Sequence, residues 1–197
     1  LVLALGLRDG VLAQPGVSQT TRSKEWPTYG HDPGGMRFSP LTQINPAHVS
    51  QLQVAWVYHM RPPQPPAAAA GPGTAAPAQG RGRGRGGSGF AASETTPLVV
   101  NGVMYITTPY GRVVALDPTT GKEVWVFQVP AGNPSTRGVE YWPGDAKVPP
   151  QIIFGTGNGR LYSLDAKTGV PTETFGDKGS LDMNTPEILG GMTGTVG

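Results

Sequence analysis

Two stretches decide the fold, 104-MYITTPYGRVVALDPTTGKEVW-125 and 152-IIFGTGNGRLYSLDAKTGVPTE-173, which align with each other without a gap. They start 48 residues apart, and the alignment brings Gly-Arg at 111–112 onto Gly-Arg at 159–160. Each stretch has the pattern of a short strand, a tight turn at Gly-Arg, a second strand and an Asp-x-x-Thr-Gly turn into a further strand. The sequence therefore contains an internal repeat of antiparallel strands.

A repeat of this length, built from short strands and glycine turns, is typical of a β-propeller blade. Gly121 and Gly169 supply the positive φ that the second turn needs, and we interpret Asp117 and Asp165 as turn residues. A blade buries its faces only against other blades, and about four to eight of them close a ring. We therefore expect an all-β chain that holds the first two or so four-stranded antiparallel blades of a longer propeller.

Residues 61–92 interrupt the pattern with RPPQPPAAAAGPGTAAPAQGRGRGRGGSGFAA, in which Gly, Pro and Ala fill most positions. Such a segment buries too little apolar surface to offset the entropy of ordering it, so we expect a disordered insertion. Its three arginines at 81–86 account for the basic charge, because the other 12 Lys and Arg face 13 acidic residues. Three Arg-Gly repeats without interleaved aromatic residues are a weak nucleic-acid signal. We predict no nucleic-acid partner.

The chain opens with LVLALGLRDGVLAQ, which resembles the end of a signal peptide with its small residues before the cut. The charges at Arg8 and Asp9 weigh against this, and the alternatives are a chance apolar start or a short core strand. The stretch is shorter than the ~20 apolar residues of a membrane-spanning helix. We expect export, with residues 1–22 as a signal-peptide remnant and a polar segment. The absence of cysteine excludes disulfides and thiolate metal sites.

Residues 23–60 are expected to join 93–197 in the propeller. Within the first part, INPAHVSQLQ at 44–53 predicts a short helix capped by Asn45, with Pro46 at its first position. The following LQVAWVYHM, at 52–60, reads as a strand because it is rich in β-formers. The tryptophans that we interpret as core or blade-docking residues are Trp26, Trp56 and Trp125.

Five motifs follow in a fixed order: WPTYGHDPGGMRFSPLTQIN, LQVAWVYHM, SETTPLVVNGVMYITTP, GRVVALDPTTGKEVW and RGVEYWPGD. Together they resemble the N-terminal part of the pyrroloquinoline quinone (PQQ)-dependent dehydrogenases, over residues 24–60 and 93–197. The resemblance implies a periplasmic eight-bladed propeller that oxidises a sugar or alcohol C–OH group and passes electrons to a membrane quinone or a cytochrome. Whether the protein is held at the membrane stays open.

The resemblance also places two residues at the cofactor. Glu94, in SETTPLVV, matches a glutamate that contacts the polar rim of PQQ, and Arg137, in RGVEYW, matches an arginine that pairs with a cofactor carboxylate. A planar guanidinium suits the three carboxylates of PQQ. The implied calcium ligands and catalytic acid are expected beyond Gly197, so we assign no catalytic residue and no metal ligand, and expect this chain alone to be inactive.

Two features bear on the branch of the family and on the alternatives. The stretch AGNPSTRG before Arg137 lacks the adjacent cysteine pair of the methanol- and ethanol-oxidising members, which favours the glucose-dehydrogenase-like branch. The spacing of His31, His48 and His59 fits no metal site. The alternative is a non-catalytic propeller with the same repeats that acts as a protein-binding scaffold. Because such scaffolds should lack RGVEYWPGD and the glutamate at 94, we favour the enzyme.

Overall fold

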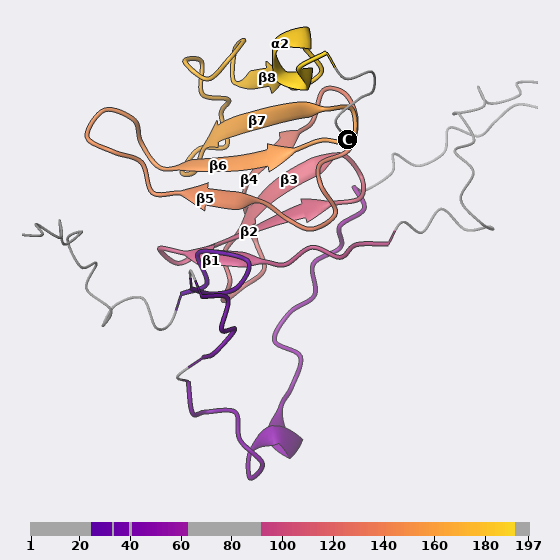
Figure 1. Ribbon diagram of the computed structural model, residues 1–197. Coiled ribbons are helices and arrows are strands. Elements are labelled where there is room, and N and C mark those ends of the chain that lie inside the picture. The colour runs from indigo at the N-terminus through magenta and orange to yellow at the C-terminus, as the bar shows by residue number, and fades with distance from the viewer. Residues whose placement is uncertain (1–24, 33, 40, 63–91, 192–197) are drawn as a thin grey trace, which may run out of the picture.

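The structure, a computed structural model, describes residues 25–32, 34–39, 41–62 and 92–191, and its strands form two four-stranded antiparallel sheets (Figure 1). The first sheet contains, in order, β1 Leu98–Val100, β2 Val103–Thr108, β3 Arg112–Leu116 and β4 Glu123–Gln128. The second contains β5 Glu140–Trp142, β6 Gln151–Gly155, β7 Arg160–Asp165 and β8 Ser180–Asp182. The predicted all-β chain with two four-stranded blades is confirmed. Residues 1–22 and nearly all of 61–92 lie outside the described residues.

The aspartates of the repeat stabilise its turns. Asp117 Oδ1 accepts a hydrogen bond from the backbone N–H of Thr119 at 2.7 Å, and Asp165 Oδ1 accepts one from that of Lys167 at 3.0 Å. A carboxylate that accepts backbone N–H groups two residues ahead fixes the chain in a turn. The interpretation of both aspartates as turn residues is confirmed.

The main hydrophobic core lies between the two sheets. Its buried members include Tyr105, Val113, Ala115 and Trp125 from the first sheet and Ile152, Phe154, Tyr162 and Leu164 from the second. The Phe154 and Tyr162 rings stack at 5.3 Å between centroids. Full burial of each such side chain contributes roughly 1.5–3 kcal/mol, so this core is what holds one blade on the other.

Trp125 joins the two sheets at one defined point. Its indole lies against Gly169, where a Cβ atom would be 2.6 Å from the ring. Its Nε1–H donates a hydrogen bond of 3.0 Å to the carbonyl oxygen of Ala166. Because Gly169 has a φ of +73° and no side chain, it satisfies the turn and makes room for the indole. The interpretation of this tryptophan as a blade-docking residue is confirmed.

Trp56 makes the same contact on the other face of the first sheet. Its indole lies against Gly121, where a Cβ atom would be 2.5 Å from the ring, and its Nε1–H donates to Pro118 O at 3.0 Å. Both contacted positions lie one repeat period before those that Trp125 contacts. Trp56 packs there with Tyr58 and Met60 against the smaller core cluster of the first sheet. Trp56 is therefore also a docking residue.

Of two predictions for residues 44–60, one was met in part and one was wrong. Asn45 caps a turn as predicted, because its Oδ1 accepts a hydrogen bond from Ala47 N at 3.0 Å and its carbonyl oxygen accepts from Val49 N at 2.9 Å. The turn leads only into a 3-10 helix, η1, at Val49–Gln51, and no α-helix forms there. Residues 52–60, predicted as a strand, belong to neither sheet of the described chain. A strand needs a hydrogen-bonded neighbour, and no described segment pairs with this one.

The outer strand of the second sheet is interrupted. The repeat places it after Gly169, but only Pro171 forms a bridge there, with Leu164, and the strand resumes as β8 at Ser180. Pro171 has no N–H to donate to the sheet, which is why proline is uncommon within strands. The helix α2, Pro186–Leu189, follows β8.

The N-terminal part of the described chain lies along the first sheet. Trp26 exchanges two backbone hydrogen bonds with Val99 of β1, at 2.8 and 2.9 Å, and its ring lies 4.7 Å from that of His31. Figure 1 shows this indigo segment beside β1. Trp26 is thus half-buried against the free edge of β1, as a core or docking residue should be.

Candidate functional site

Glu94 and Arg137 precede the first strands of the two sheets. β1 begins at Leu98 and β5 at Glu140, and these two residues pair with residues of β2 and β6 that lie one repeat period apart. Leu98 and Glu140 are therefore structural counterparts. Since Glu94 comes four residues before its strand and Arg137 three residues before its own, both lie at the same end of neighbouring sheets.

A backbone hydrogen bond joins the two segments. The N–H of Thr96 donates to the carbonyl oxygen of Arg137 at 3.2 Å. Next to it, Gly138 has a φ of +119°, and a Cβ atom there would lie 2.9 Å from the carbonyl oxygen of Thr96. Only glycine adopts this φ without strain and allows the two backbones to come so close. The sequence Arg-Gly at 137–138 is thus a contact point between the sheets.

Thr95 anchors the segment that carries Glu94. Its Oγ1 lies 3.1 Å from Thr107 Oγ1 and accepts a hydrogen bond from the backbone N–H of Thr107 at 3.3 Å. Thr107 is buried, with 1% of its surface exposed. Because Thr95 is hydrogen-bonded to β2, the backbone of the neighbouring Glu94 is held next to the first sheet.

Arg137 borders two hollows. A cavity of about 440 Å³ is lined by Tyr29, Thr96, Ser135, Arg137 and Glu140 together with apolar residues that include Phe154. A second, of about 630 Å³, is lined by Asn133, Ser135, Arg137, Thr156 and Arg160 among others. Glu94 lines neither of them. The structure therefore joins the Arg137 backbone to Thr96, two residues after Glu94, and gives only Arg137 a place in a cavity wall.

The Arg137 guanidinium is available to a ligand. The residue is exposed, and neither of the two ion pairs found among the described residues includes it. Glu94 is exposed and likewise outside both ion pairs. An exposed guanidinium at the mouth of a cavity offers a fork of donors for a planar carboxylate.

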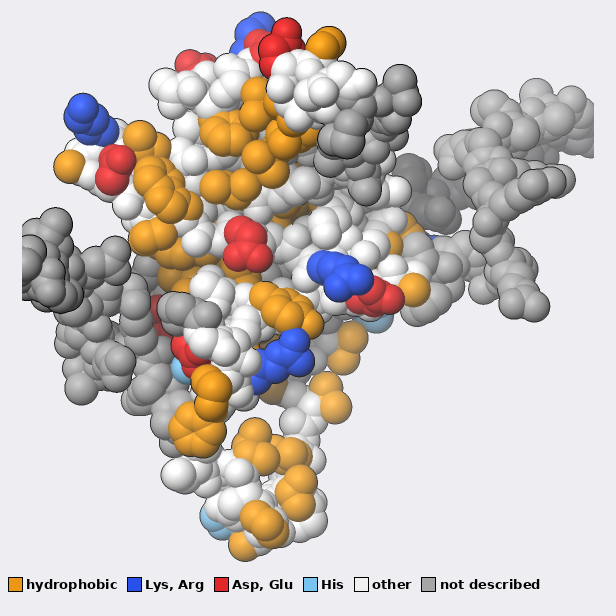
Figure 2. Space-filling view, in the orientation of Figure 1, with side chains coloured by type: hydrophobic (Ala, Val, Ile, Leu, Met, Phe, Trp, Pro, Cys, Tyr) orange, Lys and Arg blue, Asp and Glu red, His pale blue; other side chains and the backbone are white. Residues whose placement is uncertain are grey.

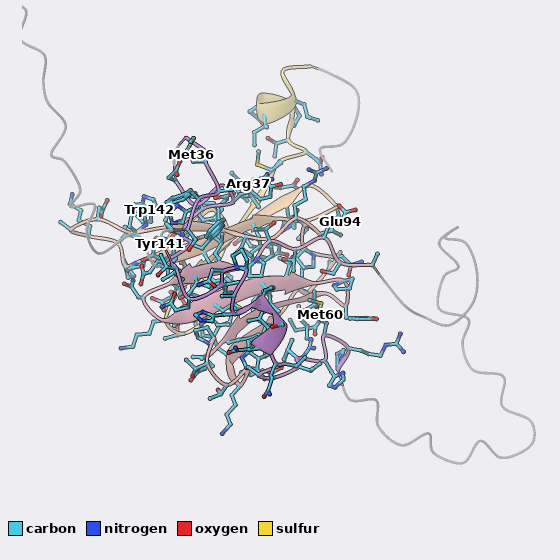
Figure 3. The ribbon with its side chains drawn as sticks, turned by 90° about the horizontal axis from the view of Figure 1, so that it is seen from below. Met36, Arg37, Met60, Glu94, Tyr141 and Trp142 are labelled. Carbon is cyan, nitrogen blue, oxygen red and sulfur yellow. The ribbon has the colours of Figure 1, made fainter. Side chains whose placement is uncertain are left out.

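The aromatic pair of the same motif has a structural role. Figure 3 places Tyr141 and Trp142 towards one end of the molecule and Glu94 at the other. Tyr141 packs against the core between the sheets, and its hydroxyl accepts a hydrogen bond from Asn101 Nδ2 at 3.5 Å. In the loop that follows, Asp145 Oδ1 accepts backbone hydrogen bonds from Lys147 at 2.7 Å and Val148 at 2.8 Å, which lower the pKa of Asp145.

Sequence reasoning did not find three residues of the cavity wall. Ser135 and Glu140 flank Arg137 in the chain, so their nearness was the available signal. Tyr29 reaches the cavity because Trp26 pairs with Val99, a long-range contact that no local pattern reveals. Figure 2 shows hydrophobic side chains gathered around β7 and β8, on the side of the second sheet away from the first.

We also searched the described residues for metal sites and for membrane-spanning helices. No group of three or more His, Asp or Glu side chains among them could hold a metal ion. Within the same residues, no helix has both the length and the apolar character needed to cross a membrane.

The sequence matches known proteins over most of its length. Residues 26–193 match the family described as glucose/ethanol/alcohol dehydrogenase, beta-propeller domain. The chain is 36% identical over 154 residues to the dehydrogenase subunit of a quinone alcohol dehydrogenase of Gluconobacter oxydans (strain 621H), covering 74% of this chain and 16% of that protein. It is 30% identical over 189 residues to the quinoprotein glucose dehydrogenase of Escherichia coli (strain K12), covering 86% and 21%.

A solved structure that resembles this chain is also a dehydrogenase of this kind. The quinohemoprotein alcohol dehydrogenase from Comamonas testosteroni superposes with a TM-score of 0.57 at 28% identity, covering 88% of this chain and 21% of that one. The chain thus spans about a fifth of the length of the relatives that it matches. Glucose and alcohol dehydrogenases are both among them, so the glucose-like branch stays a prediction. From the match over residues 26–193 and the two four-stranded sheets, the chain belongs to the PQQ-dependent glucose/ethanol/alcohol dehydrogenase family of β-propellers.

Proposed function

We propose that the protein is a PQQ-dependent dehydrogenase that oxidises a sugar or alcohol hydroxyl group to a carbonyl group and passes the two electrons to a quinone or a cytochrome. Family membership supports the reaction class. The observation that carries the proposal to this chain is Arg137, an exposed guanidinium that lines two cavities, the first of which has walls from both sheets.

The residues of the site suit the cofactor. PQQ carries three carboxylates, and the Arg137 guanidinium can bind one of them through two parallel hydrogen bonds. Ser135 and Thr96, in the wall of the same cavity, add polar groups beside the guanidinium. The resemblance assigns Glu94 to the polar rim of the ring system, where its carboxylate would accept hydrogen bonds. When bound, PQQ supplies the two-electron acceptor, and these residues hold and orient it.

Other parts of the active site belong to this proposal as well. We place the calcium ion and the catalytic carboxylate that the family implies outside residues 25–191. We also propose a periplasmic location, for which the support is the apolar stretch at the start of the sequence. A glucose-like substrate is favoured by the absence of cysteine before Arg137.

The test uses the full-length protein, stripped of cofactor and titrated with PQQ in the presence of calcium. Arg137→Ala removes a charge-assisted interaction worth roughly 1.5–3 kcal/mol, so we expect the Kd for PQQ to rise about 10- to 100-fold. Arg137→Lys keeps the charge but loses the planar pair of donors, so its Kd for PQQ should lie between those of the wild type and Arg137→Ala. The matched control is Lys122→Ala, which removes an exposed charge far along the first sheet.

Glucose and ethanol are then offered to the loaded enzyme with an artificial electron acceptor. Reduction of the acceptor with glucose supports the glucose-like assignment, and reduction with ethanol alone moves the substrate to the alcohols. An unchanged Kd for PQQ in a folded Arg137→Ala protein would contradict the role of Arg137. A full-length protein that neither binds PQQ nor oxidises either substrate would favour the non-catalytic scaffold.

A further inference from the structure

The second cavity, of about 630 Å³, has two guanidinium groups in its wall. Arg137 and Arg160 both line it, and among the described residues of the wall none is Asp or Glu. Amide and hydroxyl side chains make up the other polar part of the lining, which includes Asn133, Ser135 and Thr156. Two positive charges around one hollow, with no negative charge in its described wall, attract an anion.

Arg160 lacks the carboxylate that its repeat counterpart has. Arg112, one repeat period earlier, is buried, and its Nη1 lies 3.6 Å from Glu123 Oε1. The residue one period after Glu123 is Pro171, which bridges to β7 as Glu123 pairs with β3. Neither of the two ion pairs found in the described part of the chain includes Arg160. The second repeat thus keeps the arginine and replaces the acid that accompanies it in the first.

One carboxylate, that of Asp182, lies across the sheet from Arg160. The two residues are register partners on β8 and β7, but they form no ion pair in the described part of the chain. Asp182 Oδ1 instead accepts the backbone N–H of Asn184 at 2.9 Å, and Arg160 Nη1 donates to Ser180 Oγ at 3.2 Å. A guanidinium has several N–H donors, so the bond to Ser180 holds it in place and leaves donors for a ligand.

Backbone hydrogen bonds join the two loops that form the cavity. Ser135 N donates to the carbonyl oxygen of Gly155 at 2.9 Å, and Gly157 N donates to that of Asn133 at 3.1 Å. These bonds tie the loop before β5 to the turn between β6 and β7, and so fix the segments that carry Arg137 and Arg160 next to each other. A preformed site binds its ligand without the cost of ordering its own loops.

The rest of the wall favours an organic ligand over an inorganic ion. Pro134, Leu161 and Met183 place apolar groups in the same wall as the two arginines. The volume lies in the range of about 300–1,000 Å³ that is usual for small-molecule sites. Inorganic phosphate would leave these apolar groups uncovered, whereas a carboxylic acid brings a carbon skeleton to cover them.

We propose that this cavity binds an organic acid with two carboxylates, one held by Arg160 and the other by Arg137. A planar guanidinium pairs with a carboxylate through two parallel hydrogen bonds, which suits this class of ligand better than a single point charge would. Because Arg160 has no part in the proposed binding of PQQ, the site is separate from that function and does not rest on it.

The test uses the full-length protein without cofactor and isothermal titration calorimetry at low ionic strength. The probes are the dicarboxylates succinate, glutarate and adipate, with butyrate as a monocarboxylate and inorganic phosphate as an inorganic anion. We expect the best dicarboxylate to bind at least about tenfold more tightly than butyrate or phosphate, because only it reaches both arginines. Arg160→Gln should raise its Kd by about tenfold or more. The matched control is Lys167→Gln, which removes an exposed charge outside the cavity and should leave the Kd unchanged.

Four results would overturn the proposal. The first is that no dicarboxylate binds more tightly than butyrate. The second is that phosphate binds as tightly as the best dicarboxylate, which would leave a site for any small anion. The third is an equal Kd for the dicarboxylate in the wild type and in a folded Arg160→Gln protein.

The fourth result comes from titration of the same variants with PQQ. Arg137→Ala should weaken the binding of both PQQ and the dicarboxylate, whereas Arg160→Gln should weaken only the dicarboxylate. If Arg160→Gln weakens PQQ as much as Arg137→Ala does, the cavity belongs to the cofactor and is no separate site. A wild-type protein that binds the dicarboxylate but not PQQ would contradict the proposed function and support this site.

Discussion

The indole of Trp125 occupies the space that a side chain would need at Gly169, since a Cβ atom there would lie 2.6 Å from the ring. The contact ties a hydrophobic residue of one sheet to a turn of the next, 44 positions later in the chain. Alanine at position 169 would therefore disturb both the turn, through its positive φ, and the packing of Trp125, and a glycine with the same φ but no neighbour separates the two effects.

We predict that Gly169→Ala destabilises the chain more than Gly102→Ala does. Both glycines have a φ of +73°, so both alanines pay the backbone strain of about 1–2 kcal/mol. At Gly102 nothing lies within 4 Å of the new Cβ, whereas at Gly169 the methyl group displaces Trp125 and adds about 1–3 kcal/mol. Urea denaturation measures both changes. Equal losses of unfolding free energy would mean that the indole contact does not hold the sheets together.

A second prediction concerns the contact between Gly138 and Thr96, in the segments that precede β5 and β1. Gly138→Ala should weaken PQQ binding as well as stability, because the methyl group pushes Thr96 away from Arg137. Titration of the full-length variant with PQQ measures the first effect, and Gly102→Ala, which also puts alanine at a positive φ, shows whether such strain elsewhere changes the Kd. If Gly138→Ala lowers stability and leaves the Kd for PQQ unchanged, the position of Arg137 does not depend on this contact.

Tyr58 should make stability fall at high pH. Burial and the hydrogen bond to Glu123 raise the pKa of Tyr58 to about 12, from 10.0. The folded chain therefore keeps the phenol proton at pH values where the unfolded chain loses it, and stability declines as pH rises from about 10 to 12. Tyr58→Phe should reduce this decline; Tyr105, whose pKa burial also raises to about 12, accounts for a remaining part. Denaturant titrations at about pH 9, 10 and 11, which bracket the unfolded pKa of tyrosine, measure how steeply the unfolding free energy of each protein falls with pH.

An identical decline of stability in Tyr58→Phe and wild type would contradict the prediction. At pH 8 the variant should lose only the hydrogen bond to Glu123, a cost of roughly 0.5–1.5 kcal/mol.

Asp117 should act in the acid range with the opposite sign. Hydrogen bonds from the Thr119 side chain and backbone lower the pKa of Asp117 below 3.8. The carboxylate thus stabilises the turn above the unfolded pKa, and this contribution is lost as pH falls through the lowered pKa. Asp117→Asn should flatten the acid limb of the stability profile, measured by thermal unfolding at several pH values below 5. A variant that keeps the wild-type acid limb would show that Asp117 does not contribute to it.

The sequence predicted the parts of the fold that repeat. The Asp-x-x-Thr-Gly turns depend on local hydrogen bonds, and the alignment of the two stretches placed β2, β3, β6 and β7 in equivalent positions. It missed the interruption of the outer strand after Pro171. It gave the cap at Asn45 correctly but not the short 3-10 form of the helix that follows. Local patterns report the length of such a turn poorly, because several turn types suit the same residues.

The candidate site was harder to predict. The first and second strands are joined by the short turn Asn101-Gly102 in the first sheet and by the longer loop 143–150 in the second. This difference hides the equivalence of β1 and β5 from an ungapped alignment. Consequently the hydrogen bond between Thr96 and Arg137, which joins the segments that precede β1 and β5, had no sequence signal of its own. The roles of Glu94 and Arg137 at the cofactor stay predictions.

The interruption of the second sheet also affects what can follow it. By the repeat, the counterpart of Trp125 is Glu173, an exposed acid outside β8. Position 173 therefore offers no indole to a glycine turn, and the second sheet has the apolar side chains of Ile153 and Leu161 instead. Apolar packing is not directional, whereas the indole contact fixes both depth and rotation. Within the described chain, orientation is thus fixed by the indoles at Gly121 and Gly169, and the end of the second repeat lacks such a contact.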